Sequence, residues 1–283
     1  MTAVALEVLR SGTFTTVQDH GRPGFAHLGV ARAGVLDRPA ADLANRLVGN
    51  PEGAAVLEVT LGGLELRASG GCWVAVTGAP APVTVEGAAR GHAHAVFLPA
   101  GAVLRLGVPH RGVRSYVAVS GGVAVEPVLG SRSTDTLAWV GPSRVVDGAV
   151  LPVGVPGGAP EPHDTPRPPG RGPLRVDPGP REDWFAPGAL DVLCATAYSV
   201  AAESNRIGLR LDGPPLPRLR QGELPSEGMV LGAVQVPPSG RPVVFLADHP
   251  PTGGYPVLAV VRPEDLWQCA QLRPGDPVEF SRR

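Results

Sequence analysis

The sequence contains no lysine, so all 25 of its basic residues are arginines. Without a lysine the chain cannot form a Schiff base, cannot bind phosphate in the P-loop manner and cannot carry covalently attached biotin or lipoic acid. A phosphate bound by this chain would be held by arginines, by backbone N–H groups or by a metal ion. The absence excludes several catalytic classes and predicts that any biotin arrives on another chain.

Cysteines and long apolar runs are equally scarce. The three cysteines, Cys72, Cys194 and Cys269, are far apart and form no CxxC pair, so they indicate buried free thiols rather than a disulfide framework or a zinc site. No apolar run approaches the ~18 residues of a membrane-spanning helix, and the N-terminal stretch lacks a signal peptide's basic and apolar regions. A formal net charge of −1 implies no nucleic-acid partner. We therefore expect a cytoplasmic protein.

Glycine and proline are abundant instead. The 38 glycines and 33 prolines among 283 residues disfavour long helices, and short apolar segments recur at intervals of roughly ten residues, which is typical of β-sandwiches and β-barrels. We predict a mainly β fold with two β-rich domains and a few short helices. The expected strands are 3–17 (broken at 10–12), 55–60, 64–68, 72–77, 83–85, 92–98, 103–108, 114–119, 174–177, 191–195, 197–201, 207–211, 229–236, 242–246 and 277–280, and the expected helical segments are 36–47, 181–185 and 262–271.

A proline-rich segment divides the chain. Residues 151–173 hold eight prolines and five glycines with almost no apolar mass, which is typical of a semi-extended linker or a long exposed loop. We therefore predict an N-terminal domain at 1–150, a linker at 151–173 and a C-terminal domain at 174–283, each large enough to bury its own core.

The stretch 15–50 concentrates glycines and polar residues before a short amphipathic helix. Leucines and alanines recur at helical spacing from Leu36 to Leu47, Asp37 can cap the N-terminus, and Pro39 is tolerated in the first turn. Gly49 ends the helix. The helix itself is explained by core packing, whereas a mere connector before it would not need an Asp, an Arg and a Gln beside four glycines.

Polar, glycine-bearing loops follow several of the buried strands, and a barrel would gather such loops at one rim. Asp19, Asp135 and Asp248 are candidate general bases or metal ligands, and the alternative for each is that it caps a turn. Three arginines could bind a carboxylate or phosphate bidentately: Arg22, Arg132 and Arg206. The backbone at 252–254 could stabilise an oxyanion.

Two weaker patterns do not make sites. His92 and His94 would share one face of a strand, but no third ligand lies nearby in the sequence, so we expect no metal site. Ser131 and Ser133 lack the G-x-S-x-G environment of an activated nucleophile, which favours ordinary hydrogen bonding.

Eight blocks spread over nearly the whole chain carry a family resemblance: VQDHGRPG (17–24), ANRLVGNPEGAAVLEVT (44–60), RSYVAVSGGV (114–123), VLGSRSTDT (128–136), SNRIGLRLDGP (204–214), GAVQVPPSGRPVV (232–244), DHPPTGGYP (248–256) and AQLRPGD (270–276). In this order they resemble the family of the 5-oxoprolinase C subunit, also called allophanate hydrolase subunit 2. That family is similar to one half of the carboxyltransferase region of urea carboxylase.

The resemblance implies a cyclophilin-like β-barrel architecture and a chain that works beside a B-type subunit, which is similar to allophanate hydrolase subunit 1. With a third, amidohydrolase-like A-type subunit, such a pair cleaves 5-oxoproline to glutamate at the expense of ATP, for which Mg²⁺ is the expected counter-ion. Relatives fused to a biotin carboxylase transfer a carboxyl group to urea, and others are described as partners of a sporulation-kinase inhibitor. The resemblance implies these catalytic residues: Asp19, Asp248, Arg22 and Asp135. It implies these substrate- or nucleotide-binding residues: Gln18, Asp37, Asn45, Glu58, Ser133, Ser204, Asn205, Arg206, Gln235, Thr252, Gly254 and Tyr255.

The chain departs from the family pattern twice. The family usually has Ser-Gly-Ala before the aspartate that matches Asp37, whereas residues 33–35 of this chain are Ala-Gly-Val. The family's Asp-Arg-Gln-Thr-Thr-Gly-Gly-Tyr-Pro becomes DHPPTGGYP at 248–256, so an Arg, a Gln and a Thr are absent from a loop expected at the rim.

Three hypotheses follow. The first is that the chain is part of an ATP-dependent 5-oxoprolinase, a hydrolase of a cyclic amide, in which ATP activates the lactam carbonyl, arginines and backbone stabilise the developing charge, and Asp19 or Asp248 moves protons. The second is an allophanate-hydrolase- or urea-carboxylase-like carboxyltransferase subunit that receives biotin from another chain. The third is a non-catalytic regulatory partner of a kinase inhibitor, which the altered 249–251 loop favours.

Overall fold

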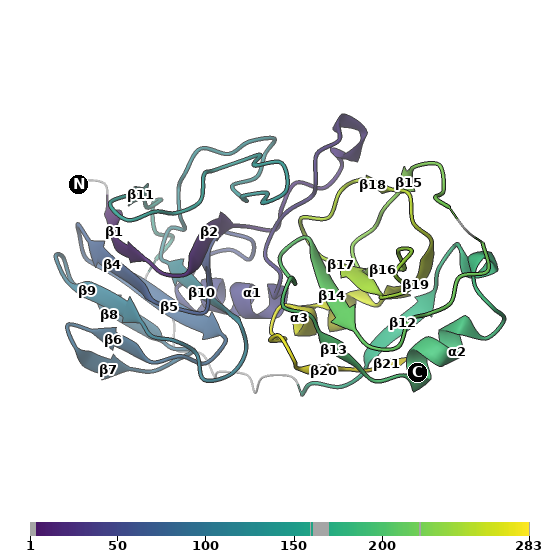
Figure 1. Ribbon diagram of the computed structural model, residues 1–283. Helices are drawn as coiled ribbons and strands as arrows, with labels where there is room; N and C mark the ends of the chain where they lie inside the picture. The colour runs from purple at the N-terminus through teal and green to yellow at the C-terminus, as the bar shows by residue number, and fades with distance from the viewer. Residues whose placement is uncertain (1–3, 159, 161–169, 221, 283) are drawn as a thin grey trace. The chain divides into compact units, whose positions relative to one another are not determined.

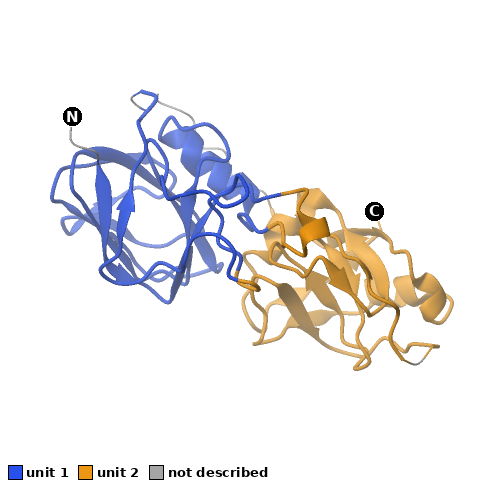
Figure 2. Ribbon diagram, turned by 90° about the horizontal axis from the view of Figure 1, so that it is seen from above, with its two compact units in different colours: residues 1–22, 33–135, 139–168 blue, residues 23–32, 136–138, 169–283 orange. Residues whose placement is uncertain are grey.

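The computed structural model describes residues 4–158, 160, 170–220 and 222–282. The fold is mainly β, as predicted, and divides into two compact units (Figure 2). The first unit comprises residues 1–22, 33–135 and 139–168, and the second comprises 23–32, 136–138 and 169–283. The predicted linker at 151–173 includes 159 and 161–169, which lie outside the described residues, and the predicted domain limits stay predictions. The first residues of the predicted linker belong to strand β11 (Val150–Pro152).

Two antiparallel sheets form the first unit (Figure 1). One has the order β11-β1-β4-β9-β6-β7 and the other β2-β3-β10-β5-β8. Their inward-facing Val and Leu side chains join in one buried apolar cluster, because alternate residues of a strand point to the same face. The strands are β1 (Ala5–Ser11), β2 (Phe14–Gln18), β3 (Val56–Thr60), β4 (Leu64–Ala68), β5 (Cys72–Gly78), β6 (Val83–Val85), β7 (Ala88–Arg90), β8 (Ala95–Leu98), β9 (Val103–Leu106), β10 (Arg114–Val119) and β11 (Val150–Pro152).

Helix α1 (Arg38–Leu47) covers the other face of the β2–β8 sheet. Its buried residues, Ala41, Ala44 and Leu47, pack in a cluster with Tyr116 and neighbouring small residues. Asp37 caps the helix through a 3.1 Å hydrogen bond that its Oδ1 accepts from the N–H of Ala40. Because this sheet is covered on both sides, the polar residues that point toward α1 are buried as well, and these include members of the predicted site.

One eight-stranded sheet forms the second unit, in the order β20-β13-β14-β17-β16-β19-β12-β21. The two edge strands, β20 and β21, are separated by one residue in the sequence, so the edges of the sheet meet and the barrel nearly closes. This confirms the expected barrel. The strands are β12 (Leu174–Pro178), β13 (Tyr198–Val200), β14 (Gly208–Asp212), β16 (Ala233–Gln235), β17 (Val243–Phe245), β19 (Val257–Val261), β20 (Pro277–Val278) and β21 (Phe280–Ser281), with a separate hairpin of β15 (Glu227–Gly228) and β18 (Thr252–Gly253).

Helices in the second unit are short: α2 (Ala189–Ala195) and α3 (Leu266–Cys269), with 3-10 turns at Ala26–Leu28, Glu182–Trp184 and Pro263–Asp265. Residues 191–195, predicted as a strand, belong to α2. The apolar run there misled the prediction, because helical spacing buries Leu190 and Leu193 while Val192 stays 50% exposed. The predicted helix at 262–271 is a 3-10 turn followed by the single turn α3.

Candidate functional site

Asp19 follows β2 and ties two distant loops of the first unit together. Its Oδ1 accepts hydrogen bonds from Ser131 Oγ (2.6 Å), Ser133 Oγ (2.6 Å) and the N–H of Gly21 (2.7 Å), and its Oδ2 accepts one from the N–H of Arg132 (2.6 Å). The pattern of buried strand followed by a glycine-rich turn places the carboxylate where these donors converge. To act as a general base, this carboxylate would first have to release a donor.

Gln18 and Arg22, which lie on either side of Asp19 in the sequence, both hold the loop at 128–134. The buried Arg22 guanidinium donates through Nε to Val128 O (3.3 Å) and through Nη2 to Ser133 O. Gln18 Nε2 donates to Thr134 O (2.9 Å). Among the described residues, Gln18 Oε1 and Thr134 Oγ1 are buried without a hydrogen-bond partner, which leaves polar capacity for a bound water or a substrate N–H.

Asp135 is fully buried, and its N–H donates to Val140 O (2.9 Å). The predicted residues Gln18, Asp19, Arg22 and Ser133 therefore form one connected cluster, and Asp135 lies in the loop that it holds. The predicted hydrogen-bonding role of the Ser131 hydroxyl is confirmed, but the sequence did not indicate Asp19 as its partner, because 112 residues separate the two.

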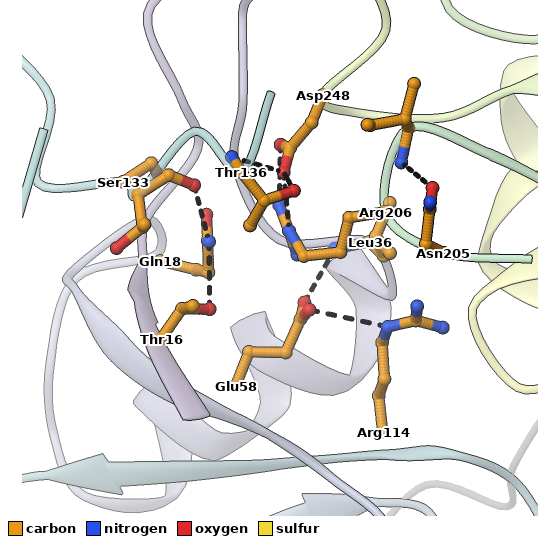
Figure 3. A network of polar contacts seen from close by, with 12 residues as sticks. Thr16, Gln18, Leu36, Glu58, Arg114, Ser133, Thr136, Asn205, Arg206 and Asp248 are labelled. Atoms are coloured by element: carbon orange, nitrogen blue, oxygen red, sulfur yellow. Dashed lines mark hydrogen bonds and ion pairs between the residues drawn. The ribbon is translucent and has the colours of Figure 1, made fainter. Parts of the chain in front are cut away.

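A second cluster of the first unit lies beneath the N-terminus of α1 (Figure 3). Glu58 on β3 accepts hydrogen bonds at Oε2 from the N–H of Leu36 (3.1 Å) and from Tyr116 Oη (2.9 Å). The same hydroxyl accepts from the N–H of Asp37 (2.8 Å), and Arg114 Nε lies 3.5 Å from Glu58 Oε1. This buried network fixes the backbone that leads from the glycine-rich loop into α1. Glu58 and Asp37 were predicted, whereas Tyr116 and Arg114 were missed although both lie in the RSYVAV block.

Burial and the negative charges of Glu58 and Asp37 raise the pKa of Tyr116 well above its usual value near 10. Below pH ~10 the folded and unfolded chains both keep this proton, and above it only the unfolded chain releases it. We expect Tyr116→Phe to lose about 1.5–3 kcal/mol of stability at pH 7, because a hydrogen bond to a charged group is removed. Above pH 10, the difference in free energy of unfolding between the wild type and Tyr116→Phe should then decrease by about 1.4 kcal/mol per pH unit. Urea unfolding of both proteins between pH 7 and 11 measures this, and a difference independent of pH would contradict it.

Asn45 holds the turn that follows α1. Its Nδ2 donates to Ala54 O (2.8 Å), and its Oδ1 accepts from Asn50 Nδ2 (3.0 Å). Asn50 in turn donates to Val119 O (2.8 Å). The pair joins the helix end to β10, which explains the two asparagines of the segment 44–50.

In the second unit, Asp248 and Arg206 form a buried bidentate ion pair (Figure 3). Arg206 Nε lies 2.9 Å from Asp248 Oδ2, and Nη2 lies 3.0 Å from Oδ1; the two side chains are 3% and 0% exposed. Thr136 adds hydrogen bonds to Oδ2 from its N–H (3.0 Å) and its Oγ1 (2.6 Å). Both Asp248 and Arg206 were predicted, but their pairing and the contribution of Thr136 were not.

The remaining predicted residues of the second unit lie in short strands and turns of this unit. Gln235 Nε2 donates to Tyr255 O (3.1 Å), at the loop that follows the β15–β18 hairpin. That hairpin contains Thr252, which is exposed. Gly254 directly follows the hairpin, and its carbonyl accepts a hydrogen bond from the N–H of Leu224 (2.8 Å). Ser204 and Asn205 shape the turn before β14: Ser204 bonds the backbone of Arg210, and Asn205 Oδ1 accepts from the N–H groups of 207 and 208.

His249 occupies the position where the family usually has an arginine. Its ring stacks on Phe245 with centroids 5.7 Å apart, and Nδ1 lies 2.8 Å from Pro250 O. A carbonyl only accepts, so Nδ1 carries the proton. Burial, reinforced by the positive charge of Arg32, lowers the pKa of His249. The substitution thus replaces a cation in this loop with a neutral ring.

His92 and His94 do not share a strand face, contrary to the prediction. Ala93 between them has a φ of 58°, and β8 starts only at Ala95, so both histidines lie in a turn. Within the described part of the chain, no group of three or more His, Cys, Asp or Glu side chains could hold a metal ion. None of the helices described there is long and apolar enough to cross a membrane.

The family model for the carboxyltransferase domain, subdomains A and B, matches residues 28–282. The chain is 38% identical over 284 residues to the 5-oxoprolinase C subunit of Escherichia coli, covering 97% of this chain and 90% of that protein. It is 31% identical to urea amidolyase of Saccharomyces cerevisiae over 98% of this chain, which is 16% of the yeast protein. The resemblance given by the eight sequence blocks is thereby confirmed.

Solved structures show the same fold. The crystal structure of TTHA0988 superposes with a TM-score of 0.89 at 40% identity, covering 99% of this chain and 56% of that one. The urea amidolyase of K. lactis superposes with a TM-score of 0.89 at 30% identity, covering 99% of this chain and 19% of that one. The chain thus spans little more than half of the first solved relative and a fifth of the second.

Proposed function

Because the chain belongs to the family of carboxyltransferase domains with subdomains A and B, we propose that it is one subunit of an ATP-dependent 5-oxoprolinase. The complex would convert 5-oxo-L-proline, ATP and water to glutamate, ADP and phosphate. The observation that carries this proposal is the 38% identity to the 5-oxoprolinase C subunit over 97% of the chain, against 31% to urea amidolyase. The partners would be a B-type subunit and an amidohydrolase-like A-type subunit.

We propose that Asp19 and Asp248 hold neighbouring groups in position rather than act as free bases. Asp19 and Asp248 each accept four hydrogen bonds, so we assign them to holding the 131–133 loop and Arg206, respectively. A bidentate carboxylate fixes a guanidinium in one orientation and neutralises its charge, so we assign the pair to holding this part of the barrel in place. The unsatisfied Gln18 Oε1 offers an acceptor that suits an amide N–H.

ATP with Mg²⁺ is the proposed co-substrate of the complex. The described residues contain no group of three or more His, Cys, Asp or Glu side chains that could hold a metal ion, so they offer no ready-made cluster of metal ligands. Since the chain has no lysine, arginines, side-chain hydroxyl and amide groups and backbone N–H groups would contact the phosphates on this chain. We propose that the metal ligands lie on the partner subunits and derive no step through the metal.

A second candidate is a carboxyltransferase subunit with a urea-type substrate, which the family model and the likeness to urea amidolyase favour. Since the chain has no lysine, biotin would have to arrive on another chain. ADP release by the complex of all three proteins discriminates the two: we expect release that depends on 5-oxoproline and not on urea. Release that requires urea, bicarbonate and a biotin-bearing chain would favour the second candidate. A stable complex that turns over neither substrate would favour the regulatory partner.

A further inference from the structure

The structure distinguishes the three arginines that the sequence offers for binding a carboxylate or phosphate. Arg206 already holds Asp248 through two hydrogen bonds, so its charge is neutralised within the second unit. Arg22 is 1% exposed, and its guanidinium donates to two main-chain oxygens of the loop at 128–134. Both guanidinium groups are thus committed to partners within the chain. The third arginine, Arg132, is held in a different way.

Arg132 is fixed at two points and keeps the outer edge of its guanidinium open. Its backbone N–H donates to Asp19 Oδ2 (2.6 Å), and its Nε donates to Val125 O (2.7 Å). Within the described residues, its Nη1 and Nη2 atoms have no hydrogen-bond acceptor and no carboxylate partner. Because Nε is occupied, the edge formed by Nη1 and Nη2 presents two parallel N–H groups. A ligand carboxylate can bind to this edge without displacing a contact of the fold.

An arginine without a counter-ion stands out in the first unit. Arg46, Arg67 and Arg105 each have a nitrogen within 3.2 Å of a carboxylate oxygen, although all three are exposed and gain little stability from the pair. Arg132 is partly buried. Its charge therefore loses part of its hydration and gains no ion pair among the described residues in return, so the stability of the unit does not account for an arginine at this position.

The backbone around Arg132 favours a carboxylate over a phosphate as the ligand. Phosphate sites commonly add several main-chain N–H groups to the arginine, but the N–H groups of residues 131–135 all have acceptors within the first unit. The hydroxyls of Ser131 and Ser133 likewise donate to Asp19. In this segment the guanidinium edge is therefore the solvent-accessible donor that remains. It matches the two oxygens and the single negative charge of a carboxylate.

We propose that Arg132 binds the carboxylate of the small-molecule substrate. This inference rests on the proposed function, under which the ligand is 5-oxo-L-proline, a cyclic amide with one carboxylate on its ring. The carboxylate accepts hydrogen bonds from both Nη groups, while Val125 O and Asp19 keep the arginine in place. Urea has no carboxylate, so the same contact selects the lactam acid over a urea-type substrate. Arg132 is thus a binding and specificity residue, and Asp19 is its positioning residue.

Arg132→Gln, combined with a neutral analogue of the substrate, tests the contact. Isothermal titration calorimetry without ATP measures the dissociation constant of 5-oxo-L-proline for the complex of this chain with its A-type and B-type partners. This constant should rise about tenfold to a hundredfold, because a charge-assisted bidentate contact is lost. The amide of 5-oxoproline has no negative charge and should bind the wild type and the variant nearly equally. In steady-state turnover, the KM for 5-oxo-L-proline should rise in the same way and the KM for ATP should stay the same.

Two further variants complete the series. Arg132→Lys keeps the charge but has neither the two-donor edge nor the bond to Val125 O, so its affinity for 5-oxo-L-proline should lie between those of the wild type and Arg132→Gln. Arg144→Gln is the matched control. The Arg144 guanidinium also donates to a main-chain oxygen of the first unit, Thr13 O (3.0 Å), but it lies outside the loop at 128–134. Arg144→Gln should leave the dissociation constants of both ligands unchanged.

The outcomes separate this inference from the proposed function. An unchanged affinity of Arg132→Gln for 5-oxo-L-proline, or an equal loss of the acid and its amide, would overturn the carboxylate contact. A rise in the KM for ATP alone would assign Arg132 to the phosphates and overturn it as well. Turnover of 5-oxo-L-proline that does not depend on Arg132 would leave the proposed function standing, whereas Arg132-dependent binding without turnover would leave only the contact. If the wild-type complex did not bind 5-oxo-L-proline, both would fail.

Discussion

Replacing Asp248 with alanine is expected to lower the free energy of unfolding by roughly 3–5 kcal/mol. The substitution leaves the 3%-exposed guanidinium of Arg206 without its bidentate partner, and it removes the acceptor for both Thr136 donors. Leaving a buried charge without its counter-ion destabilises the folded state by far more than the intact ion pair stabilises it. Urea unfolding of the purified chain measures the change. Turnover by the complex should fall with it, because Arg206 loses its fixed orientation.

The exposed pair of Asp212 and Arg241 in the same unit provides the control. Its N–O distance is also 2.9 Å, but the two side chains are 49% and 61% exposed. Asp212→Ala should therefore change stability by about 1 kcal/mol or less. Replacing both members of the buried pair, as in Asp248→Leu with Arg206→Met, should recover most of the stability and none of the turnover. A single-variant loss no larger than that of Asp212→Ala would contradict this account of the pair.

Asp19→Ala is expected to have the second largest effect. It removes a carboxylate that accepts from two serine hydroxyls and two backbone N–H groups at 2.6–2.7 Å, so donors at the base of the 131–133 loop lose their acceptor. We expect a stability loss of roughly 3 kcal/mol and a fall in turnover on the order of 10²-fold, because the loop is displaced from its working position. Urea unfolding and ADP release by the complex measure the two effects.

Asp147 is the matched control for Asp19. Its Oδ1 accepts from the backbone N–H and the hydroxyl of Ser11, both at 2.7 Å, but it lies at the surface, where water replaces lost acceptors. Asp147→Ala should leave both stability and turnover nearly unchanged. If Asp19→Ala behaved like Asp147→Ala, the loop anchor that we assign to Asp19 would be wrong.

Local signals in the sequence predicted the local structure well. The capping of α1 by Asp37 involves residues three apart, and most strands follow from short apolar runs between glycines. The prediction for 191–195 was wrong because an apolar run of that length is compatible with a strand or a buried helix turn. The strand predicted to begin at His92 begins only at Ala95, because Ala93 has a left-handed backbone conformation. An alanine in the sequence gives no indication of such a conformation.

The pairings within the candidate site could not be predicted from the residues alone. Asp248 and Arg206 are 42 residues apart and Asp19 and Ser133 are 114 apart, so only the folded barrel and sheets bring them together. The family resemblance named most of these residues but not their partners. Tyr116 and Thr136 were missed because the sequence shows one as an ordinary strand residue and the other as an ordinary loop residue. Only the structure shows that each hydroxyl donates a hydrogen bond to a buried carboxylate.

The most direct measurement of the central claim is the consumption of 5-oxo-L-proline by the two partner proteins with and without this chain. We predict that the A-type and B-type proteins alone form no glutamate, and that adding this chain restores glutamate and ADP in equal amounts. Glutamate formation that proceeds without this chain, or ADP release that follows urea instead, would contradict its assignment as a 5-oxoprolinase subunit.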